Sequence, residues 1–479
     1  MADYEALRQR HLMHLFETMP EMLARLTRSP DQLHSQREAA LQAIVAHARS
    51  RSRWHRARLA TVEPAHLTEI GMRALPTMTK DDLMRHFDDI VTDPRLTRDA
   101  VENHLSELAT DAYLFDEYHV CASGGSSGRR GAFVFDFEGW AVTFASYLRF
   151  SLHLAQQVLG SAELSPIAVV AADKASHMTS AMAQTFAIPG SAAHRIPATL
   201  PIDRIVEQLN EVQPQYLTGY ASMVHQLTRE ATAGRLHIAP RMVGTTSEPL
   251  LPEIRASITE TWGAPIFNGF GSTEGLMGGS CAAGRGIHLS EDLFVIEPVD
   301  ARCEPVQPGE RASKVLITSL YNRVQPLIRY ELTDEVGVLE GPCPCGVSLL
   351  RIDDIQGRLD DVFTYGSGLT VHPFTFRSVL GRERDIIEYQ VMQTPRGAEI
   401  RVRGEGAIDG VPHGVVRPSC PRESRSLRRG SHRHCRRRPR PAGIRQVSAV
   451  RPSAPQADAL NTRPRIRDST SAKRTGEFH

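Results

Sequence analysis

Hydrophobic and polar positions follow a helical period over roughly the first 110 residues. Apolar side chains recur at helical spacing between charges in residues 4–16 and 32–56, a pattern that predicts amphipathic helices. The stretch Leu75-Pro-Thr-Met-Thr-Lys-Asp-Asp82 predicts a turn followed by a helix, with Thr79 as its N-cap and acidic residues in its first turn. Residues 1–110 are therefore expected to form the N-terminal helical part of a large domain.

After about residue 110 the pattern changes to short β-rich runs that alternate with helical stretches. Predicted strands include Ile167-Ala-Val-Val-Ala-Ala172, Tyr216-Leu-Thr-Gly219 and Met242-Val-Gly-Thr-Thr246. Helical stretches at residues 205–212 and 222–231 lie between them. This βα order indicates mainly parallel sheets covered by helices. We therefore predict an α/β fold, with residues 111–357 as the body of the large domain.

Composition narrows the class of protein. The chain has 479 residues, 41% of them hydrophobic and 23% charged, which is ordinary for a soluble globular protein. No apolar run approaches the ~18 residues of a membrane span, and the acidic start Met-Ala-Asp-Tyr-Glu is not a signal peptide. Cytoplasmic location and no membrane partner are expected. Seven irregularly spaced cysteines indicate reduced thiols or a metal site, not a disulfide framework.

Charge is distributed unevenly along the chain. Seventeen Lys/Arg and four Asp/Glu lie from Val411 to the end, which leaves 39 basic and 51 acidic residues, a net charge of −12, before it. The acidic body does not favour nucleic acid as a partner. The Arg/Pro/Ser-rich tail at residues 411–479 is expected to be disordered, and it could bind polyanions only non-specifically.

A glycine- and serine-rich stretch, Ala122-Ser-Gly-Gly-Ser-Ser-Gly-Arg-Arg-Gly131, is a candidate phosphate loop. Glycines allow several backbone N–H groups to point inward at an anion, and serine hydroxyls add donors without bulk. A simple hairpin or linker is the alternative for this loop taken alone. It is not a Walker loop or a dinucleotide fingerprint, because no Gly-Lys-Ser/Thr closes it and its glycine spacing differs.

Four further stretches carry groups suited to a nucleotide site. They are Thr246-Ser-Glu-Pro249, Phe267-Asn-Gly-Phe-Gly-Ser-Thr-Glu-Gly275, Pro326-Leu-Ile-Arg-Tyr-Glu-Leu-Thr-Asp334 and Ile355-Gln-Gly-Arg-Leu-Asp-Asp-Val-Phe363. Each also has a simpler interpretation: Asp334 as a turn or cap residue, Glu274 as a solvated side chain, and Gly-Arg-x-Asp-Asp as an exposed turn.

Taken in order, these five stretches resemble the adenylate-forming superfamily of acyl-CoA synthetases, in particular its phenylacetate-CoA ligase branch. Leu75-Pro-Thr-Met-Thr-Lys80, Gly286-Ile-His-Leu-Ser-Glu-Asp292 and Thr370-Val-His-Pro373 also match that branch. The resemblance covers roughly residues 70–405. It implies a large multi-subdomain N-terminal domain and a small C-terminal α/β domain, with the hinge and the start of the small domain at residues 358–410.

The same resemblance implies an activity and roles for residues. A carboxylic acid, aryl or arylacetic, would react with ATP and Mg²⁺ to form an acyl-adenylate, and the acyl group would pass to CoA. Thr273 would donate to the α-phosphate, Glu274 would bind magnesium, Arg358 would hold the nucleoside and Asp360 would be the hinge. The other expected nucleotide contacts are Ser123, Gly124, Gly125, Ser126, Ser127 and Gly128 in the loop, Ser247, Glu248, Pro249, Asn268, Gly269, Phe270, Gly271 and Ser272 near the base and phosphates, and Asp334 at the ribose.

Four metal-binding side chains form a second candidate site. Cys281, His288, Cys343 and Cys345 would satisfy a tetrahedral Cys₃His zinc site, although ordinary buried thiols are the alternative. Members of the phenylacetate-CoA ligase branch have a similar Cys/His placement.

Two other functions and the tail stay open at this point. The acyl acceptor could be a carrier protein or an amine, or the chain could be a nucleotide- or nucleic-acid-binding protein without ligase activity. Family members end in a Ser/Thr-Gly-Lys motif whose lysine contacts the reacting groups, and no such motif is present here. The small domain is therefore truncated or scrambled, and the tail is either a genuine arm or the product of a frameshift that impairs adenylation.

Overall fold

The computed structural model describes residues 4–123, 131–171, 175–307 and 309–353, followed by the shorter segments 363–365, 370–371, 386–394, 397–404, 417–418 and 445–450. The chain divides into two compact units: Met1–Thr364 with Thr370–Ser378, and Tyr365–Leu369 with Val379–His479. The finer predicted subdivision at residues 110 and 357 stays a prediction.

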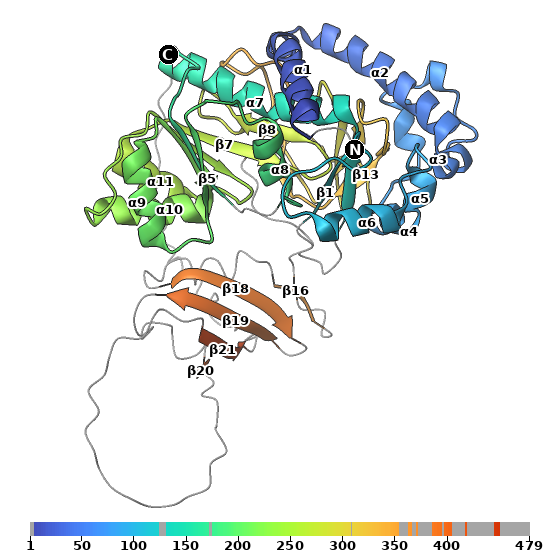
Figure 1. Cartoon of the computed structure of the whole chain (residues 1–479). Helices are drawn as coiled ribbons and strands as arrows, with labels where there is room; N and C mark the ends of the chain where they lie inside the picture. Colours follow the sequence, from blue (N-terminus) through green and yellow to red (C-terminus); the bar gives the residue numbers. More distant parts are fainter. Residues whose placement is uncertain are drawn as a thin grey trace, which may run out of the picture. The chain divides into compact units, whose positions relative to one another are not determined.

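The first unit begins with helices, as the periodicity predicted (Figure 1). Thr79 is the N-cap of α4, and its side chain and that of Asp82 form a capping box. Such reciprocal hydrogen bonds satisfy backbone N–H groups that the helix start leaves unpaired. The helices of this region are α1 Tyr4–Arg25, α2 Pro30–Arg51, α3 Arg53–Arg58, α4 Lys80–Arg85, α5 Phe87–Ile90 and α6 Arg98–Glu107, with 3₁₀ turns η1 Pro64–His66 and η2 Gly71–Ala74.

An eight-stranded sheet forms the centre of this unit, in the order β15-β9-β8-β7-β6-β5-β3-β4. The five neighbouring strands β7, β6, β5, β3 and β4 are parallel. By contrast, β8, β9 and β15 run antiparallel to their neighbours. The three predicted strands are confirmed as β3, β5 and β6. The bounds are β3 Ile167–Ala171, β4 Ala193–Pro197, β5 Tyr216–Tyr220, β6 Met242–Thr246, β7 Ile266–Gly271, β8 Met277–Ser280, β9 Ile287–Leu289 and β15 Arg351–Ile352.

Helices pack on this sheet, as an α/β fold requires. The long helix α7 Phe137–Leu159 contacts β7 and β8, and Figure 1 shows α9, α10 and α11 grouped near β5. The bounds of the other helices are α8 Met178–Thr185, α9 Ile202–Val212, α10 Ala221–Thr232 and α11 Pro252–Trp262. No described helix is both long and apolar enough to cross a membrane.

Smaller sheets complete the first unit. The hairpin of β1 His119–Ala122 and β2 Ala132–Phe135 flanks the glycine-rich loop. A second sheet has the order β10-β12-β13. Its strands and the remaining short ones are β10 Phe294–Val299, β12 Lys314–Ser319 and β13 Tyr330–Leu332, the pair β11 Arg311–Ala312 and β14 Val336–Gly337, and the pair β16 Phe363–Thr364 and β17 Thr370–Val371.

The second unit contains an antiparallel sheet of order β18-β19-β21-β20. Its strands are β18 Ile386–Thr394, β19 Gly397–Gly404, β20 Arg417–Pro418 and β21 Arg445–Val450. Two of these strands, β20 and β21, lie inside the tail at residues 411–479, whose expected disorder stays a prediction. Segment 445–450 has three apolar residues in its last four positions, and its backbone pairs with β19.

Candidate active site and metal centre

The turn between β7 and β8 carries Thr273 and Glu274 at the carboxyl end of the parallel strands. Ser272 N donates to the Leu276 carbonyl at 2.9 Å, and Gly275 N donates to the Ser272 carbonyl at 3.0 Å. Leu276 N also donates to Ser272 Oγ at 3.3 Å. Glu274 is only 6% exposed, so the turn holds a carboxylate inside the protein.

Gly275 fixes this turn against Tyr321, which lies two residues after β12. Its φ of +97° is a left-handed conformation, and a Cβ there would lie 2.4 Å from the Tyr321 hydroxyl. That hydroxyl donates to the Gly275 carbonyl at 3.2 Å and is 2.8 Å from Thr143 Oγ1 on α7. Any side chain at position 275 would therefore push the turn away from Tyr321.

Residues predicted to contact the base and phosphates lie on neighbouring strand ends. Asn268 Oδ1 accepts from Thr245 Oγ1 at 3.2 Å, and Asn268 N donates to Ser280 Oγ at 2.6 Å. Gly269, Phe270 and Gly271 complete β7. These bonds join β7 to β6 on one side and to β8 on the other. Ligands of open α/β sheets bind outside the carboxyl ends of the parallel strands, here the ends of β6 and β7.

The Ser247-Glu248-Pro249 segment follows β6 directly. Ser247 has a φ of +64°, an uncommon conformation for a residue with a side chain. The Glu248 carboxylate accepts from both Ser222 N, at 2.8 Å, and Ser222 Oγ, at 3.1 Å. Glu248 therefore caps the first turn of α10, a contact that the sequence pattern did not indicate.

Asp334 lies two residues after β13, which ends at Leu332. Its carboxylate is buried, with 5% of the residue exposed. Nearby, Arg329 makes two hydrogen bonds to Glu297, at 3.0 and 3.1 Å. Asp334 is therefore a buried carboxylate, and its role at the ribose stays a prediction beside that of a turn or cap residue.

The candidate phosphate loop begins and ends in a closed hairpin. Ser123 N donates to the Gly131 carbonyl at 2.9 Å, and Gly131 N donates to Ser123 Oγ at 2.8 Å. The buried Gln325 side chain bonds both Val134 N and the Ala132 carbonyl, at 3.0 and 3.2 Å. Gly124, Gly125, Ser126, Ser127 and Gly128 lie outside the described residues, as do Arg358 and Asp360.

The structure brings the four predicted metal-binding side chains together. The donor atoms of Cys281, His288, Cys343 and Cys345 all lie within 4.8 Å of one another. Cys281 Sγ is 3.2 Å from Cys343 Sγ, and Cys345 Sγ is 3.3 Å from His288 Nε2. Tetrahedral zinc with bonds of about 2.0–2.3 Å needs donors separated by about 3.5–4 Å. The two separations of 3.2 and 3.3 Å are slightly shorter than this, so small side-chain movements would let the four donors surround the metal.

The surroundings of His288 suit a metal ligand. Its Nδ1 lies 2.9 Å from the Leu349 carbonyl, which selects the tautomer with Nε2 unprotonated and directed at the cysteines. Burial lowers the pKa of His288 to about 4, so the imidazole is neutral near pH 7. Burial opposes ionisation of Cys343, but hydrogen bonds from the Cys345 backbone and neighbouring thiols, with Arg351 nearby, lower its pKa.

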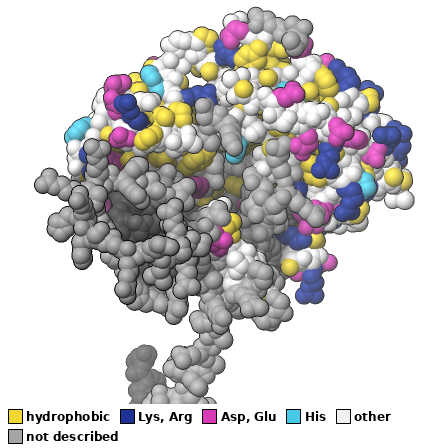
Figure 2. All heavy atoms as spheres, turned by 60° about the horizontal axis from the view of Figure 1, so that its bottom comes forward, with side chains coloured by type: hydrophobic (Ala, Val, Ile, Leu, Met, Phe, Trp, Pro, Cys, Tyr) yellow, Lys and Arg dark blue, Asp and Glu magenta, His cyan; other side chains and the backbone are white. Residues whose placement is uncertain are grey.

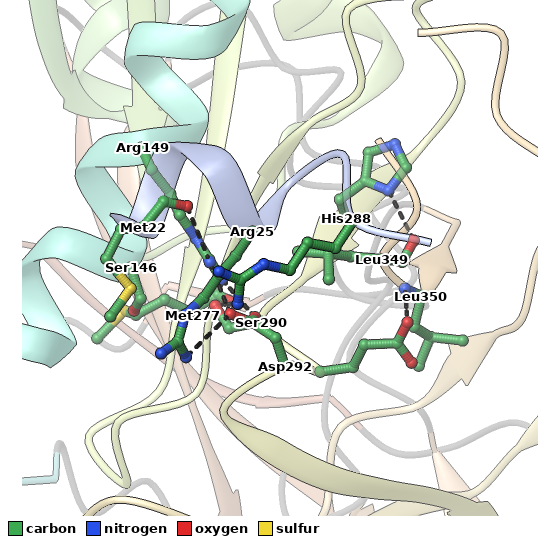
Figure 3. Close-up of polar contacts among 12 residues, drawn as sticks. Met22, Arg25, Ser146, Arg149, Met277, His288, Ser290, Asp292, Leu349 and Leu350 are labelled. Atoms are coloured by element: carbon green, nitrogen blue, oxygen red, sulfur yellow. Dashed lines mark hydrogen bonds and ion pairs between the residues drawn. The ribbon is translucent and has the colours of Figure 1, made fainter. Parts of the chain in front are cut away.

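A buried ion pair lies in the segment that follows His288. Figure 3 shows Arg149 of α7 and Arg25 of α1 both directed at Asp292. Arg149 makes bonds of 2.6 and 2.8 Å to the two carboxylate oxygens, and Arg25 is 3.8 Å away. Glu291 accepts from Leu350 N at 2.8 Å. Helices α1 and α7 are thereby joined to the region of the Cys/His cluster.

Comparisons with known proteins bear on this arrangement. No protein-family profile matches the chain. The chain is 26% identical over 215 residues to phenylacetate-coenzyme A ligase of Thermus thermophilus, covering 43% of this chain and 46% of the relative. It is 24% identical over 193 residues to Protein CapK of Staphylococcus aureus, covering 39% and 41%. The match thus spans less than half the length of these curated relatives.

Solved structures match more of the chain. A crystal structure of 2-hydroxyisobutyryl-CoA ligase in complex with 2-HIB-AMP gives a TM-score of 0.60 at 22% identity, over 77% of this chain and 76% of that chain. The chain therefore has the fold of this CoA ligase. An open conformation of the same ligase, with 2-HIB-AMP and CoA, gives 0.57 at 20% identity over 79% and 86%. Together with the sequence relatives, these structures confirm the resemblance to the phenylacetate-CoA ligase-like branch.

Sequence reasoning missed several side chains near the candidate sites. Thr143 contacts Tyr321, whose hydroxyl bonds the Gly275 carbonyl, Tyr147 lies over Gly269 of β7, and Arg351 donates to Cys343 Sγ at 3.1 Å. A signal for Thr143 and Tyr147 does exist. Thr143, Tyr147 and Ser151 are spaced by four in a largely apolar helix, which places three hydroxyls on one face.

Proposed function

We propose that the protein activates a carboxylic acid with ATP and transfers the acyl group to CoA. In the first step a carboxylate oxygen attacks the α-phosphorus, the bond to the β-phosphate breaks, and pyrophosphate leaves. In the second step the CoA thiolate attacks the acyl carbon, the acyl–phosphate C–O bond breaks, and AMP leaves. The observation that carries the proposal is the buried Glu274 in the turn at the carboxyl ends of β6 and β7.

The residues of this site have complementary tasks. Two anions must meet in the first step, so the site has to neutralise phosphate charge and hold the reactants in line. Thr273 would donate to the α-phosphate, and Asp334 would accept hydrogen bonds from the ribose hydroxyls. Adenine would lie between Ser247-Glu248-Pro249 and Phe270. Glu274 would hold Mg²⁺, which prefers carboxylate oxygen and supplies positive charge to the phosphates.

Roles at positions outside the described residues complete the proposal. The loop from Gly124 to Gly128 would bind the β- and γ-phosphates, with Ser126 and Ser127 as additional donors. Arg358 would contact the nucleoside. Asp360 would be the hinge about which the small domain rotates between the two steps. An aryl or arylacetic acid is the proposed substrate, supported by the likeness to phenylacetate-coenzyme A ligase.

We also propose that Cys281, His288, Cys343 and Cys345 bind one structural zinc ion. The donor separations and the Leu349 contact of His288 support this. A Cys₃His set leaves no open position, so the metal would fix the end of β8 and strand β9 to the cysteine loop without taking part in the reaction.

Exchange of radiolabelled pyrophosphate into ATP, driven by a panel of aryl and arylacetic acids, tests the first step. Thioester formation from the same acids and CoA tests the second. Acid-dependent exchange is the expected result. If ATP binds in calorimetry but no acid drives exchange and no thioester forms, the ligase proposal is wrong for this chain.

A further inference from the structure

The buried face of α7 carries a row of hydroxyls in an otherwise largely apolar helix. Thr143, Tyr147 and Ser151 are four residues apart and therefore lie on one face. Thr143 Oγ1 is 2.8 Å from the Tyr321 hydroxyl, and Ser151 Oγ is 3.5 Å from the Tyr216 hydroxyl. Tyr147 packs edge-on against Phe267 of β7, with ring centroids 5.6 Å apart. This row therefore faces the central sheet.

Glycines in the sheet make room for these hydroxyls. A Cβ on Gly269 would lie 2.4 Å from the Tyr147 hydroxyl. A Cβ on Gly244 would lie 2.6 Å from both the Tyr216 hydroxyl and Thr218 Oγ1. Gly244 is on β6 and Gly269 is on the neighbouring strand β7. Two phenols and a threonine hydroxyl therefore converge over two adjacent strands. Both strands carry glycine at these positions and so have no side chain there.

These hydroxyls lie in neighbouring groups along the same face of the sheet. The Ser151 hydroxyl donates to that of Tyr216 at 3.5 Å, Tyr216 and Thr218 both approach Gly244, and Tyr147 lies over Gly269 and interacts with Thr246. We call the six residues the α7 hydroxyl cluster: Thr143, Tyr147, Ser151, Tyr216, Thr218 and Thr246. Each phenol has one donor hydrogen and oxygen lone pairs, so the cluster can both donate to and accept from a further polar group.

The cluster begins at the proposed site of acid activation. Thr246 is the last residue of β6, and Gly269 is two residues before the end of β7. Thr143 reaches the turn of Glu274 through Tyr321, whose hydroxyl bonds the Gly275 carbonyl. Thr143 and Ser151 are buried, whereas Tyr147, Tyr216 and Thr218 are half-buried and keep accessible surface.

We propose that the α7 hydroxyl cluster binds a polar substituent of the acid, so that the substrate is a hydroxy- or amino-substituted carboxylic acid and not a purely hydrocarbon one. This inference rests on the proposed function, because it places the substituted end of that carboxylic acid against the cluster. Burial raises the pKa of Tyr147 and that of Tyr216, the latter to about 12, so both phenols keep their donor hydrogens near pH 7.

The competing explanation is that the hydroxyls only satisfy one another. In that case, removing a phenolic oxygen changes stability and affects all acids equally. A site built to hydrogen-bond a substrate hydroxyl behaves differently, because its polar groups lose their partner when the analogue lacks that hydroxyl. Selectivity between matched acids therefore separates the two explanations.

Calorimetric titration of the full-length protein with AMP present and matched acids measures this selectivity without requiring turnover. The pairs are 4-hydroxybenzoate and benzoate, 4-hydroxyphenylacetate and phenylacetate, and 2-hydroxyisobutyrate and isobutyrate. In at least one pair the hydroxylated acid should bind about tenfold tighter or more, and Tyr147→Phe or Tyr216→Phe should reduce that ratio about tenfold. Tyr118→Phe is the matched control, since the Tyr118 hydroxyl contacts Asp93 instead, and should preserve the ratio.

Three results would overturn the proposal. They are equal affinity for the two acids of every pair, no binding of any acid, or an equal loss of affinity for both acids of a pair in the tyrosine variants. Thr218→Val, read in the same titration, serves if a tyrosine variant does not fold. A preserved binding preference without pyrophosphate exchange would contradict the ligase proposal and leave this inference standing.

Discussion

Asp292 is a buried carboxylate whose partners are held by two different helices. Arg149 is fully buried and bonds both carboxylate oxygens, and Arg25 approaches from α1. Burial alone would raise the pKa of Asp292, but the charge and hydrogen bonds of Arg149 outweigh it and lower that pKa. Asp292 therefore ionises more readily in the folded protein than in the unfolded chain.

Replacing Asp292 by Asn tests this ion pair. The substitution leaves the Arg149 charge buried without its partner, so we expect Asp292→Asn to lower the free energy of unfolding by about 3–5 kcal/mol. Because the folded pKa is depressed, the loss should be complete above the unfolded value of about 4 and should shrink as pH falls below it. Urea unfolding between pH 3 and 7 measures both effects, and a difference independent of pH would contradict the assignment.

Glu274 and Asp334 permit a second prediction at single residues. Glu274→Gln and Asp334→Asn remove a charge proposed to bind Mg²⁺ or ribose while nearly preserving shape. Each should reduce acid-dependent pyrophosphate exchange by about 10²–10³-fold, as for other lost electrostatic contacts of a transition state. Glu17→Gln, on the exposed face of α1, is the control. Near-normal exchange in either site variant, with wild-type activity in the control, would show that the residue is misassigned.

Among secondary structure elements, β8 connects the two candidate sites. The turn with Glu274 precedes Met277, and Cys281 directly follows Ser280 at the other end of the strand. Strand β9 carries His288 and pairs with β8. The Cys/His cluster therefore fixes the end of the hairpin opposite to the turn, so metal binding and the geometry of the turn are expected to be coupled.

Metal analysis of freshly purified protein should find about one zinc ion per chain, because a four-ligand set holds the metal tightly. Cys343→Ser should abolish the zinc and lower the melting temperature, whereas Cys303→Ser, a half-buried thiol outside the cluster, should retain both. Zinc-free protein of unchanged stability, with activity intact, would instead identify the four side chains as ordinary residues.

The sequence predicted a feature correctly where the residues that determine it lie within one short segment. The period of β3, β5 and β6, the Thr79 cap and the Cys/His donor types all belong to this class. The remaining features depend on which segments become neighbours. Glu248 caps α10 only because β6 ends beside that helix, and the role of Gly269 follows from Tyr147 lying over it. No spacing along the chain encodes those contacts.

For the whole molecule, charge separates the acidic body from the basic tail. On the face shown in Figure 2, the described Lys/Arg and Asp/Glu side chains are interspersed over the surface. Such a mixture does not form the single-sign patch that nucleic-acid binding requires. On this face, the described side chains therefore form no single-sign patch.

The tail supports a prediction about the whole enzyme. Residues 434–453, from His434 to Ser453, can be written in codons whose neighbouring frame encodes Thr-Val-Val-Asp-Asp-Leu-Ala-Arg-Pro-Ala-Ser-Gly-Lys-Phe-Arg-Arg-Phe-Val-Pro-Leu. The third bases of these codons were chosen freely. That frame contains the Ser-Gly-Lys motif which the family resemblance implies, and its lysine codon would straddle Gln446 and Val447, within β21.

Substituting this alternative segment for residues 434–453 should therefore increase acid-dependent pyrophosphate exchange on the order of 10²-fold or more, because the lysine supplies charge at the reacting carboxylate and α-phosphate. The same segment with alanine at its lysine is the matched control, and it should show no gain. Equal exchange by the original chain and the substituted one would show that this lysine is not needed. Resequencing of the gene decides the origin of the tail, since an unbroken reading frame would make it genuine.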